Sequence, residues 1–162
     1  MSSSGKTGLR CEAIRRSLAQ RHGQDPGAGA IAGAALGLWR EVADCLAPLI
    51  GSRGVDALVR RSLQLTTPAF PWLGLSGERA DGLGPLTGIK PLLEARDPMA
   101  AIEASVALLV AFTDLLATMI GASLTDRLLD PIWTSPPPSS RRRPHHEPKG
   151  MYQATPLRRS RA

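Results

Sequence analysis

Residues 46–58, Leu-Ala-Pro-Leu-Ile-Gly-Ser-Arg-Gly-Val-Asp-Ala-Leu, decide the fold because their pattern occurs twice in the chain. Residues 116–128 read Leu-Ala-Thr-Met-Ile-Gly-Ala-Ser-Leu-Thr-Asp-Arg-Leu, so that six residues return at a constant shift of seventy positions. In each copy an apolar helical pattern leads into a glycine, and a second helical pattern follows it. We therefore predict one helix-glycine-helix unit that is used twice.

Each predicted unit forms a helical hairpin. In the first unit, apolar residues at spacings of three and four run over residues 28–46 and again over 55–65. In the second unit, Asp97 is placed to cap a helix that Pro98 begins, and Gly121 ends it. The sequence thus predicts an all-α domain over residues 28–133, in which two hairpins related by a pseudo-twofold pack as an irregular four-helix bundle.

Charge separates this domain from the two ends of the chain. Residues 1–27 carry a net charge of +3 and residues 134–162 carry +6, whereas the whole chain carries +6, so residues 28–133 carry −3. Residues 9–21 could form a short basic helix with Leu9, Ala13, Ile14 and Leu18 on one side, but we favour a solvated segment and interpret residues 1–27 as a largely flexible basic arm. We interpret residues 134–162 as a disordered Pro/Arg-rich tail. The high isoelectric point therefore describes the ends of the chain and not the predicted domain.

Several functional classes find no support in the sequence. Cys11 and Cys45 are the only cysteines, too few for a disulfide framework or a thiolate metal site. Gly5-Lys6-Thr7 resembles the end of a phosphate-binding loop but lacks the preceding glycine and strand, and the adjacent His145 and His146 cannot fill a metal site alone. We expect no enzymatic activity, no cofactor and no metal.

The sequence shows neither a signal peptide nor an apolar run of the roughly 20 residues needed to span a membrane. We therefore expect no transmembrane segment and a cytoplasmic location.

Four aspartates recur in the repeat. Asp56 and Asp126 follow the two glycines, where a carboxylate stabilises a helix N-terminus, so we interpret them as capping residues. Asp44 and Asp114 lie inside otherwise apolar helices and need a partner. They could face a polar seam near Thr113 and Thr118 or pair with Arg60 and Arg61 of a neighbouring helix, and we expect an ion pair.

The features that the two copies of the repeat do not share are the candidates for a functional role. Gly29, Gly33 and Gly37 are four residues apart and predict a seam that another helix approaches closely. Between the units, the segment Phe70-Pro71-Trp72-Leu73 interrupts a long proline- and glycine-rich crossover, either as a plug in the core or as the lip of a binding site. The candidate interaction residues are Trp39, Arg60, Arg61, Phe70 and Trp72.

The arginines of the tail, Arg141, Arg142 and Arg143, suggest a second kind of partner. Their charge alone would attract nucleic acid, an anionic lipid or an acidic protein.

Over residues 36–129 the order Leu-Trp-Arg, Ala-Pro-Leu-Ile-Gly, Val-Asp-Ala-Leu, Arg-Arg-Ser-Leu and Phe-Pro-Trp-Leu resembles small all-helical bacterial proteins of unassigned function. The resemblance implies a regulatory or interaction role, accessory to signalling, and it transfers no catalytic residue. The expected function is a non-enzymatic module that binds another protein or its own copy. The alternative is a nucleic-acid-associated regulator that acts through the tail.

Overall fold

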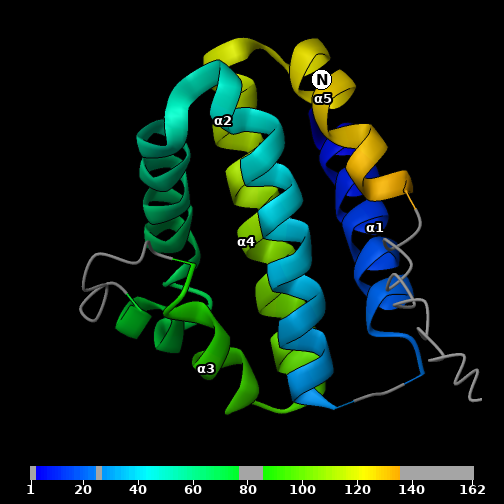
Figure 1. Cartoon of the computed structure of the whole chain (residues 1–162), viewed down its shortest axis with the longest axis vertical. Coiled ribbons are helices and arrows are strands. Elements are labelled where there is room, and N and C mark those ends of the chain that lie inside the picture. Colours follow the sequence, from blue (N-terminus) through cyan, green and yellow to red (C-terminus); the bar gives the residue numbers. More distant parts are fainter. Residues whose placement is uncertain (1–2, 25–26, 77–85, 136–162) are drawn as a thin grey trace, which may run out of the picture.

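The computed structural model of the chain describes residues 3–24, 27–76 and 86–135. These ranges contain helices and no strands, so the predicted all-α bundle is confirmed (Figure 1). The predicted disordered tail, residues 134–162, lies outside the described residues apart from Thr134 and Ser135. The elements in chain order are α1 (Ser3–His22), α2 (Ala28–Thr66), the 3-10 helix η1 (Pro71–Ser76), α3 (Ile89–Glu94), α4 (Pro98–Ile120) and α5 (Ala122–Thr134).

Both predicted corners form at their glycines. α2 consists of two helical arms, residues 28–50 and 52–66, which meet at Gly51 with φ 76° and ψ 158°. Gly121, between α4 and α5, adopts the closely similar values φ 90° and ψ 148°. This backbone region is essentially open to glycine alone, which explains why each copy of the repeat has glycine at this position.

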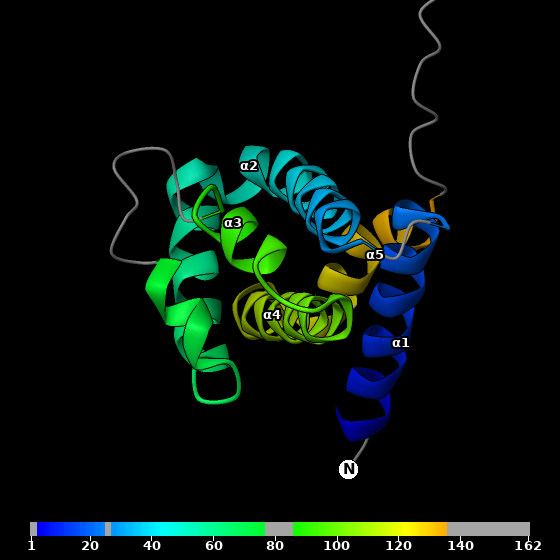
Figure 2. The ribbon, with the colours of Figure 1, turned by 90° about the horizontal axis from the view of Figure 1, so that it is seen from below.

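The first arm of α2 and α4 form the centre of the bundle. Both corners lie at the same end of the molecule (Figure 1). Seen along the bundle, the second arm of α2 lies on one side of this central pair, and α1 and α5 lie on the other (Figure 2). The largest fully buried side chains of the central pair are Ile31, Leu38, Trp39, Leu46, Leu108, Leu109 and Phe112. The pseudo-twofold relation between the hairpins stays a prediction.

The N-terminal segment differs from the prediction. Residues 3–22 form α1, which contacts α2, α4 and α5, and the side chains of Ile14 and Leu18 are fully buried. The prediction of a largely flexible arm is therefore wrong for these residues, and the described domain begins at α1 rather than at residue 28. The physical reason is that carboxylates of other helices pair with the arginines of α1, which removes the charge that favoured a solvated arm.

α4 begins at Pro98, where the sequence predicts it. The carboxylate of Asp97 accepts hydrogen bonds from the backbone N–H groups of Met99 and Ala100, as expected of a helix cap.

Among the described residues, α4 is the one helix long and apolar enough to cross a membrane, a property that core helices of soluble proteins share. Half of its most apolar stretch is buried inside the bundle.

The predicted glycine seam does not pack closely. A Cβ atom built on Gly29 or Gly33 would have no neighbour within 4 Å, and one on Gly37 would meet only the guanidinium of Arg21, at 3.9 Å. The interpretation of these glycines as a close helix–helix contact is wrong. Gly29 and Gly33 instead lie at exposed positions of the first arm of α2.

Candidate functional site

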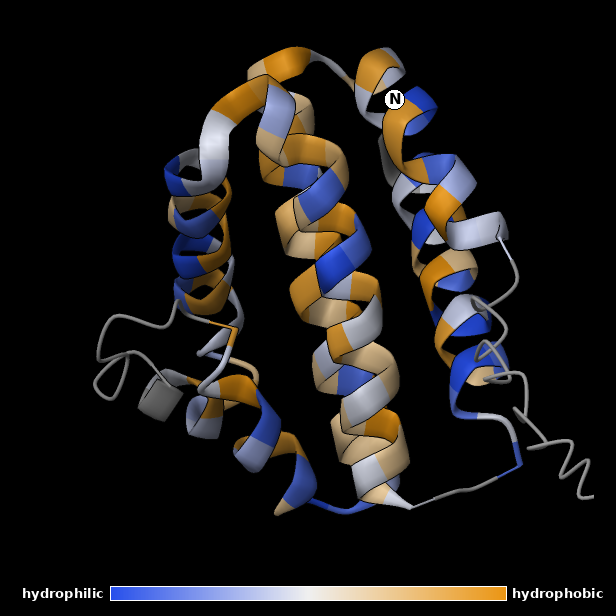
Figure 3. Cartoon of the chain, viewed as in Figure 1, coloured by the Kyte–Doolittle hydropathy of each residue, from blue (hydrophilic) through white to orange (hydrophobic). Residues whose placement is uncertain are grey.

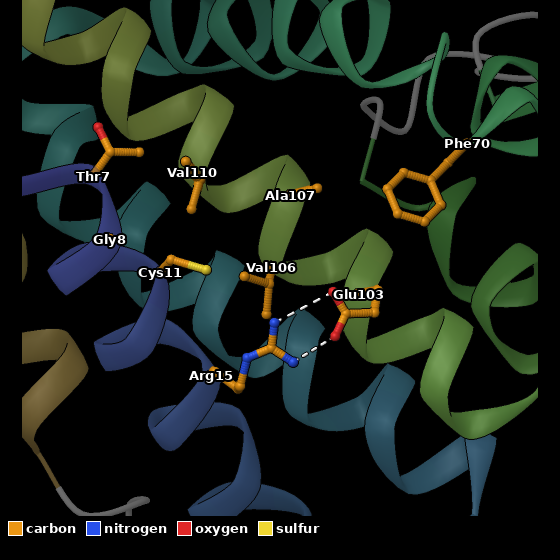
Figure 4. Close-up of a pocket in the computed structure, with 9 residues that line it drawn as sticks. All are labelled: Thr7, Gly8, Cys11, Arg15, Phe70, Glu103, Val106, Ala107 and Val110. Carbon is orange, nitrogen blue, oxygen red and sulfur yellow. Dashed lines mark hydrogen bonds and ion pairs between the residues drawn. The ribbon is translucent and has the colours of Figure 1, made fainter. Parts of the chain in front are cut away.

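A groove runs along the side of α4 that faces α1. Glu103, Val106, Ala107 and Val110 are spaced at three, four and seven residues, which places them on one side of the helix. α1 forms one wall of the groove and Phe70, just before η1, stands on the other side (Figure 4). The cavity measures about 530 Å³. We call it the α4 groove, and its lining residues on α1 are Thr7, Gly8, Cys11 and Arg15.

An ion pair spans the α4 groove between α1 and α4. The two guanidinium nitrogens of Arg15 lie 2.5 and 3.3 Å from the two carboxylate oxygens of Glu103 (Figure 4). The hydrogen bond from Arg15 holds the pKa of Glu103 below its ordinary value of about 4.5, although burial opposes this shift. The same hydrogen bond raises the pKa of Arg15. Both side chains remain about two-fifths exposed, so a ligand in the groove would meet charged groups at this position.

Two further arginines fix the wall that α1 forms. Arg10 donates to Asp126 of α5 at 2.7 and 2.9 Å and to Asp114 of α4 at 3.2 Å. Arg21 donates to both carboxylate oxygens of Glu41 in α2, at 2.6 and 2.8 Å, and its side chain is 5% exposed. α1 is therefore tied to three other helices by charge-assisted hydrogen bonds.

These contacts correct the interpretation of the repeated aspartates. Asp114 does not meet Arg60 or Arg61, because Arg10 is its cation. Asp126 does not cap α5, whose first residue has no side-chain cap, but shares the same guanidinium. Both carboxylates hold α1 in place.

The opposite wall combines the two roles that the sequence allowed. Leu73 is fully buried and so fills the core. Phe70 is partly buried and lines the α4 groove. Its ring packs edge-to-face against Trp72, at 6.1 Å between centroids, and the guanidinium of Arg96 lies 5.0 Å from the Trp72 ring. One short segment thus supplies both the plug and the lip.

The other candidate interaction residues lie elsewhere. Trp39 is 1% exposed and packs in the core, so its assignment to an interaction surface is wrong. Arg60 and Arg61 are exposed on the second arm of α2 but do not line the groove. The tail residues Arg141, Arg142 and Arg143 lie outside the described residues.

The sequence does not lead us to the lining from α1, because we interpret that segment as flexible. A signal is present in the sequence, since Ile14 and Leu18 are four residues apart and share the helix side that is buried.

Within the described ranges, no group of three or more His, Cys, Asp or Glu residues is arranged to hold a metal ion. The cysteines Cys11 and Cys45 are free and partly buried.

Comparisons of the chain with protein-family models, with curated proteins and with solved structures find no match.

Proposed function

We propose that the protein is a non-enzymatic, cytoplasmic regulatory module whose α4 groove binds an apolar segment of another protein. The observation that supports this proposal is the composition of the groove. Its base is apolar at Val106, Ala107 and Val110, and Phe70 adds an aromatic side chain at its edge. Binding sites commonly combine an apolar lining with a few polar groups that fix the orientation of the ligand.

An amphipathic helix is the form of partner segment that suits this site. A helix presents apolar residues at spacings of three and four, the spacings that separate Val110 from Ala107 and Val106 at the base of the groove. The exposed Arg15–Glu103 pair at one side of the groove would meet charged residues of the partner and set its direction.

Binding is favoured over catalysis by the polar groups that the groove contains. Its lining has one hydroxyl, one thiol, one guanidinium and one carboxylate, and the last two are bonded to each other. A hydrolytic or transfer reaction would instead require a nucleophile beside a free base.

Site-specific photocrosslinking in cells tests the proposal. A photoreactive phenylalanine analogue replaces Ala107 in the groove, and the matched control replaces Ala57, which is exposed on the second arm of α2. We expect a protein partner to crosslink at position 107 and not at 57, and the added substitution Val110→Glu to remove the product. Equal products at both positions, or a product that Val110→Glu leaves unchanged, would contradict the proposal.

The alternative function, nucleic-acid binding through Arg141, Arg142 and Arg143, is supported by the charge of the tail alone. Deletion of residues 136–162 separates the two proposals and leaves the buried Trp133 in place. The groove proposal predicts that the crosslink at Ala107 survives this deletion. Salt-sensitive DNA binding that disappears with the tail, together with an unchanged absence of crosslinks at Ala107, would favour the alternative.

A further inference from the structure

Charge attaches α1 to the other helices of the domain. Over residues 3–22 the helix carries five cations against the single carboxylate of Glu12, a net charge of +4. Three of these cations, Arg10, Arg15 and Arg21, donate hydrogen bonds to carboxylates of α2, α4 and α5. The four carboxylates that accept these bonds are between 31% and 46% exposed, so water and salt ions reach every one of the pairs. Such pairs weaken as salt is added.

The apolar core depends little on α1. The large side chains of α1 that are fully buried are those of Ile14 and Leu18. The other ten of the largest fully buried side chains belong to α2, η1, α3 and α4. The packing of Trp39 against Phe112 joins α2 to α4 without a side chain from α1. The core that α2–α5 share is therefore largely complete when α1 is left out.

The position of α1 allows it to move without the other helices. Figure 2 shows α1 at the edge of the bundle, beside α5 and on the side away from the second arm of α2. Its chain connection to α2 runs through residues 23–27. Release of α1 thus requires a rotation about this one connection and no rearrangement of α2–α5.

We propose that α1 undocks from α2–α5 as a unit while the rest of the bundle stays folded, and that its docking controls the α4 groove. An element with few buried apolar contacts opens at a lower free energy than the whole domain unfolds. α1 supplies four of the nine residues that line the groove, so the groove is complete while α1 is docked. The control of the groove rests on the binding function proposed for it, whereas the undocking of α1 does not.

The equilibrium between docked and undocked α1 is sensitive to charge. In the docked state the side chains of Arg10 and Arg21 are 11% and 5% exposed, and carboxylates of other helices balance their charge. When α1 leaves, both guanidinium groups return to water and the carboxylates lose their cations. Added salt screens the attraction in the docked state and so favours release. The fold thereby contains a salt-sensitive switch for the groove.

Hydrogen exchange of the full chain, followed by mass spectrometry of peptic fragments, tests the undocking. The amides of α1 should exchange at least about tenfold faster than those of α4, and the difference should grow as sodium chloride is added. Arg10→Gln removes the hydrogen bonds to Asp114 and Asp126. It should speed the exchange of α1 by about a further tenfold and leave that of α4 unchanged.

The matched control for this variant is Arg16→Gln. It removes the same charge from the same helix, but Arg16 is exposed and pairs with Glu12 within α1, at 4.0 Å. The exchange of α1 should therefore change by less than about twofold.

Three results of the exchange experiment would overturn the proposal. Equal exchange of α1 and α4 at every salt concentration would make α1 part of the globally unfolding unit. A loss of protection in α4 as large as that in α1, on replacement of Arg10, would show that the bundle does not stay folded without α1. An effect of Arg16→Gln as large as that of Arg10→Gln would show that the total charge of α1 matters and its pairs with other helices do not.

Photocrosslinking at Ala107 tests the control of the groove. Arg10→Glu places a further carboxylate beside Asp114 and Asp126, so it should release α1 and largely abolish the crosslink, although Arg10 does not line the groove. Arg16→Glu, the matched control, should leave the crosslink in place. A crosslink that persists while the exchange of α1 shows its release would overturn the control by α1. No crosslink in the unmodified chain would contradict the function proposed for the groove, and the exchange experiment would still decide whether α1 undocks.

Discussion

The rings of Trp39 in α2 and Phe112 in α4 pack edge-to-face, with 5.1 Å between their centroids. Both side chains are 1% exposed, so this contact joins the two central helices inside the core. Trp39→Ala should lower the free energy of unfolding by about 3–5 kcal/mol, because it removes a large apolar side chain and leaves a cavity. Denaturant unfolding followed by circular dichroism measures the loss. A stable Trp39→Ala variant that has lost only partner binding would restore Trp39 as an interaction residue.

The corner glycines allow a prediction with an internal control. Gly51→Ala should destabilise the protein by about 2 kcal/mol, because its φ of 76° and ψ of 158° are strained for any residue with a Cβ atom. Gly33→Ala, on the exposed side of a regular helix with no neighbour within 4 Å, should stabilise it by about 0.5–1 kcal/mol. Thermal unfolding of the two variants compares the effects. If both shift the melting temperature in the same direction, the corner conformation is not the cause.

The sequence predicts the helices and corners because their signals are local. The apolar spacing within α2 and α4, the cap at Asp97 and the two glycines all act within a few residues of where they stand in the chain. Local signals do not report which helices come together. From the sequence we therefore place Trp39 at an interaction surface, although Phe112, 73 residues later, covers it in the core.

The site was harder to predict for the same reason. Arg10 pairs with Asp114 and Asp126, which are 104 and 116 residues away, and Arg15 pairs with Glu103 at a separation of 88. Without these distant carboxylates the arginines of α1 indicate a solvated arm. Phe70 was identified because an aromatic residue in a proline- and glycine-rich crossover is conspicuous in the sequence itself.

Because Arg21 is more deeply buried than Glu41, we predict that replacing Glu41 and replacing Arg21 lower the free energy of unfolding by different amounts. Glu41→Ala leaves the guanidinium of Arg21, 5% exposed, without its carboxylate and should cost roughly 3 kcal/mol of unfolding free energy. Arg21→Met should cost less, because the methionine side chain can pack in place of the guanidinium and Glu41 is one-third exposed to water. Urea unfolding of both variants and of the double variant measures the difference. A larger loss for Arg21→Met would show that packing of the arginine matters more than its charge.

Substitutions at Phe70 and at Leu73 should have different effects, one mainly on partner binding and the other mainly on stability. Leu73→Ala removes a fully buried side chain and should lower the unfolding free energy by about 3 kcal/mol. Phe70→Ala, which removes a partly buried ring at the edge of the α4 groove, should cost about 1 kcal/mol and weaken partner capture at Ala107. Calorimetry and the crosslinking yield are compared for the same preparations. An unchanged yield for Phe70→Ala would remove Phe70 from the binding site.

The Arg15–Glu103 pair across the groove predicts how stability depends on pH. Because its hydrogen bond to Arg15 lowers the pKa of Glu103 in the folded state, the pair stabilises the fold above about pH 4.5, the ordinary value for glutamate, and this contribution is lost as the pH falls through the lower, folded value. Both side chains are about two-fifths exposed, so Glu103→Gln should cost only about 0.5 kcal/mol at pH 7.

The difference between the wild-type chain and Glu103→Gln should therefore shrink as the pH is lowered from 6 to 3. Chemical denaturation over this range measures it, and Glu94→Gln, whose carboxylate forms an exposed pair with Lys90, serves as the control for loss of a surface carboxylate. A difference that stays constant with pH would show that Glu103 acts through packing and not through its charge.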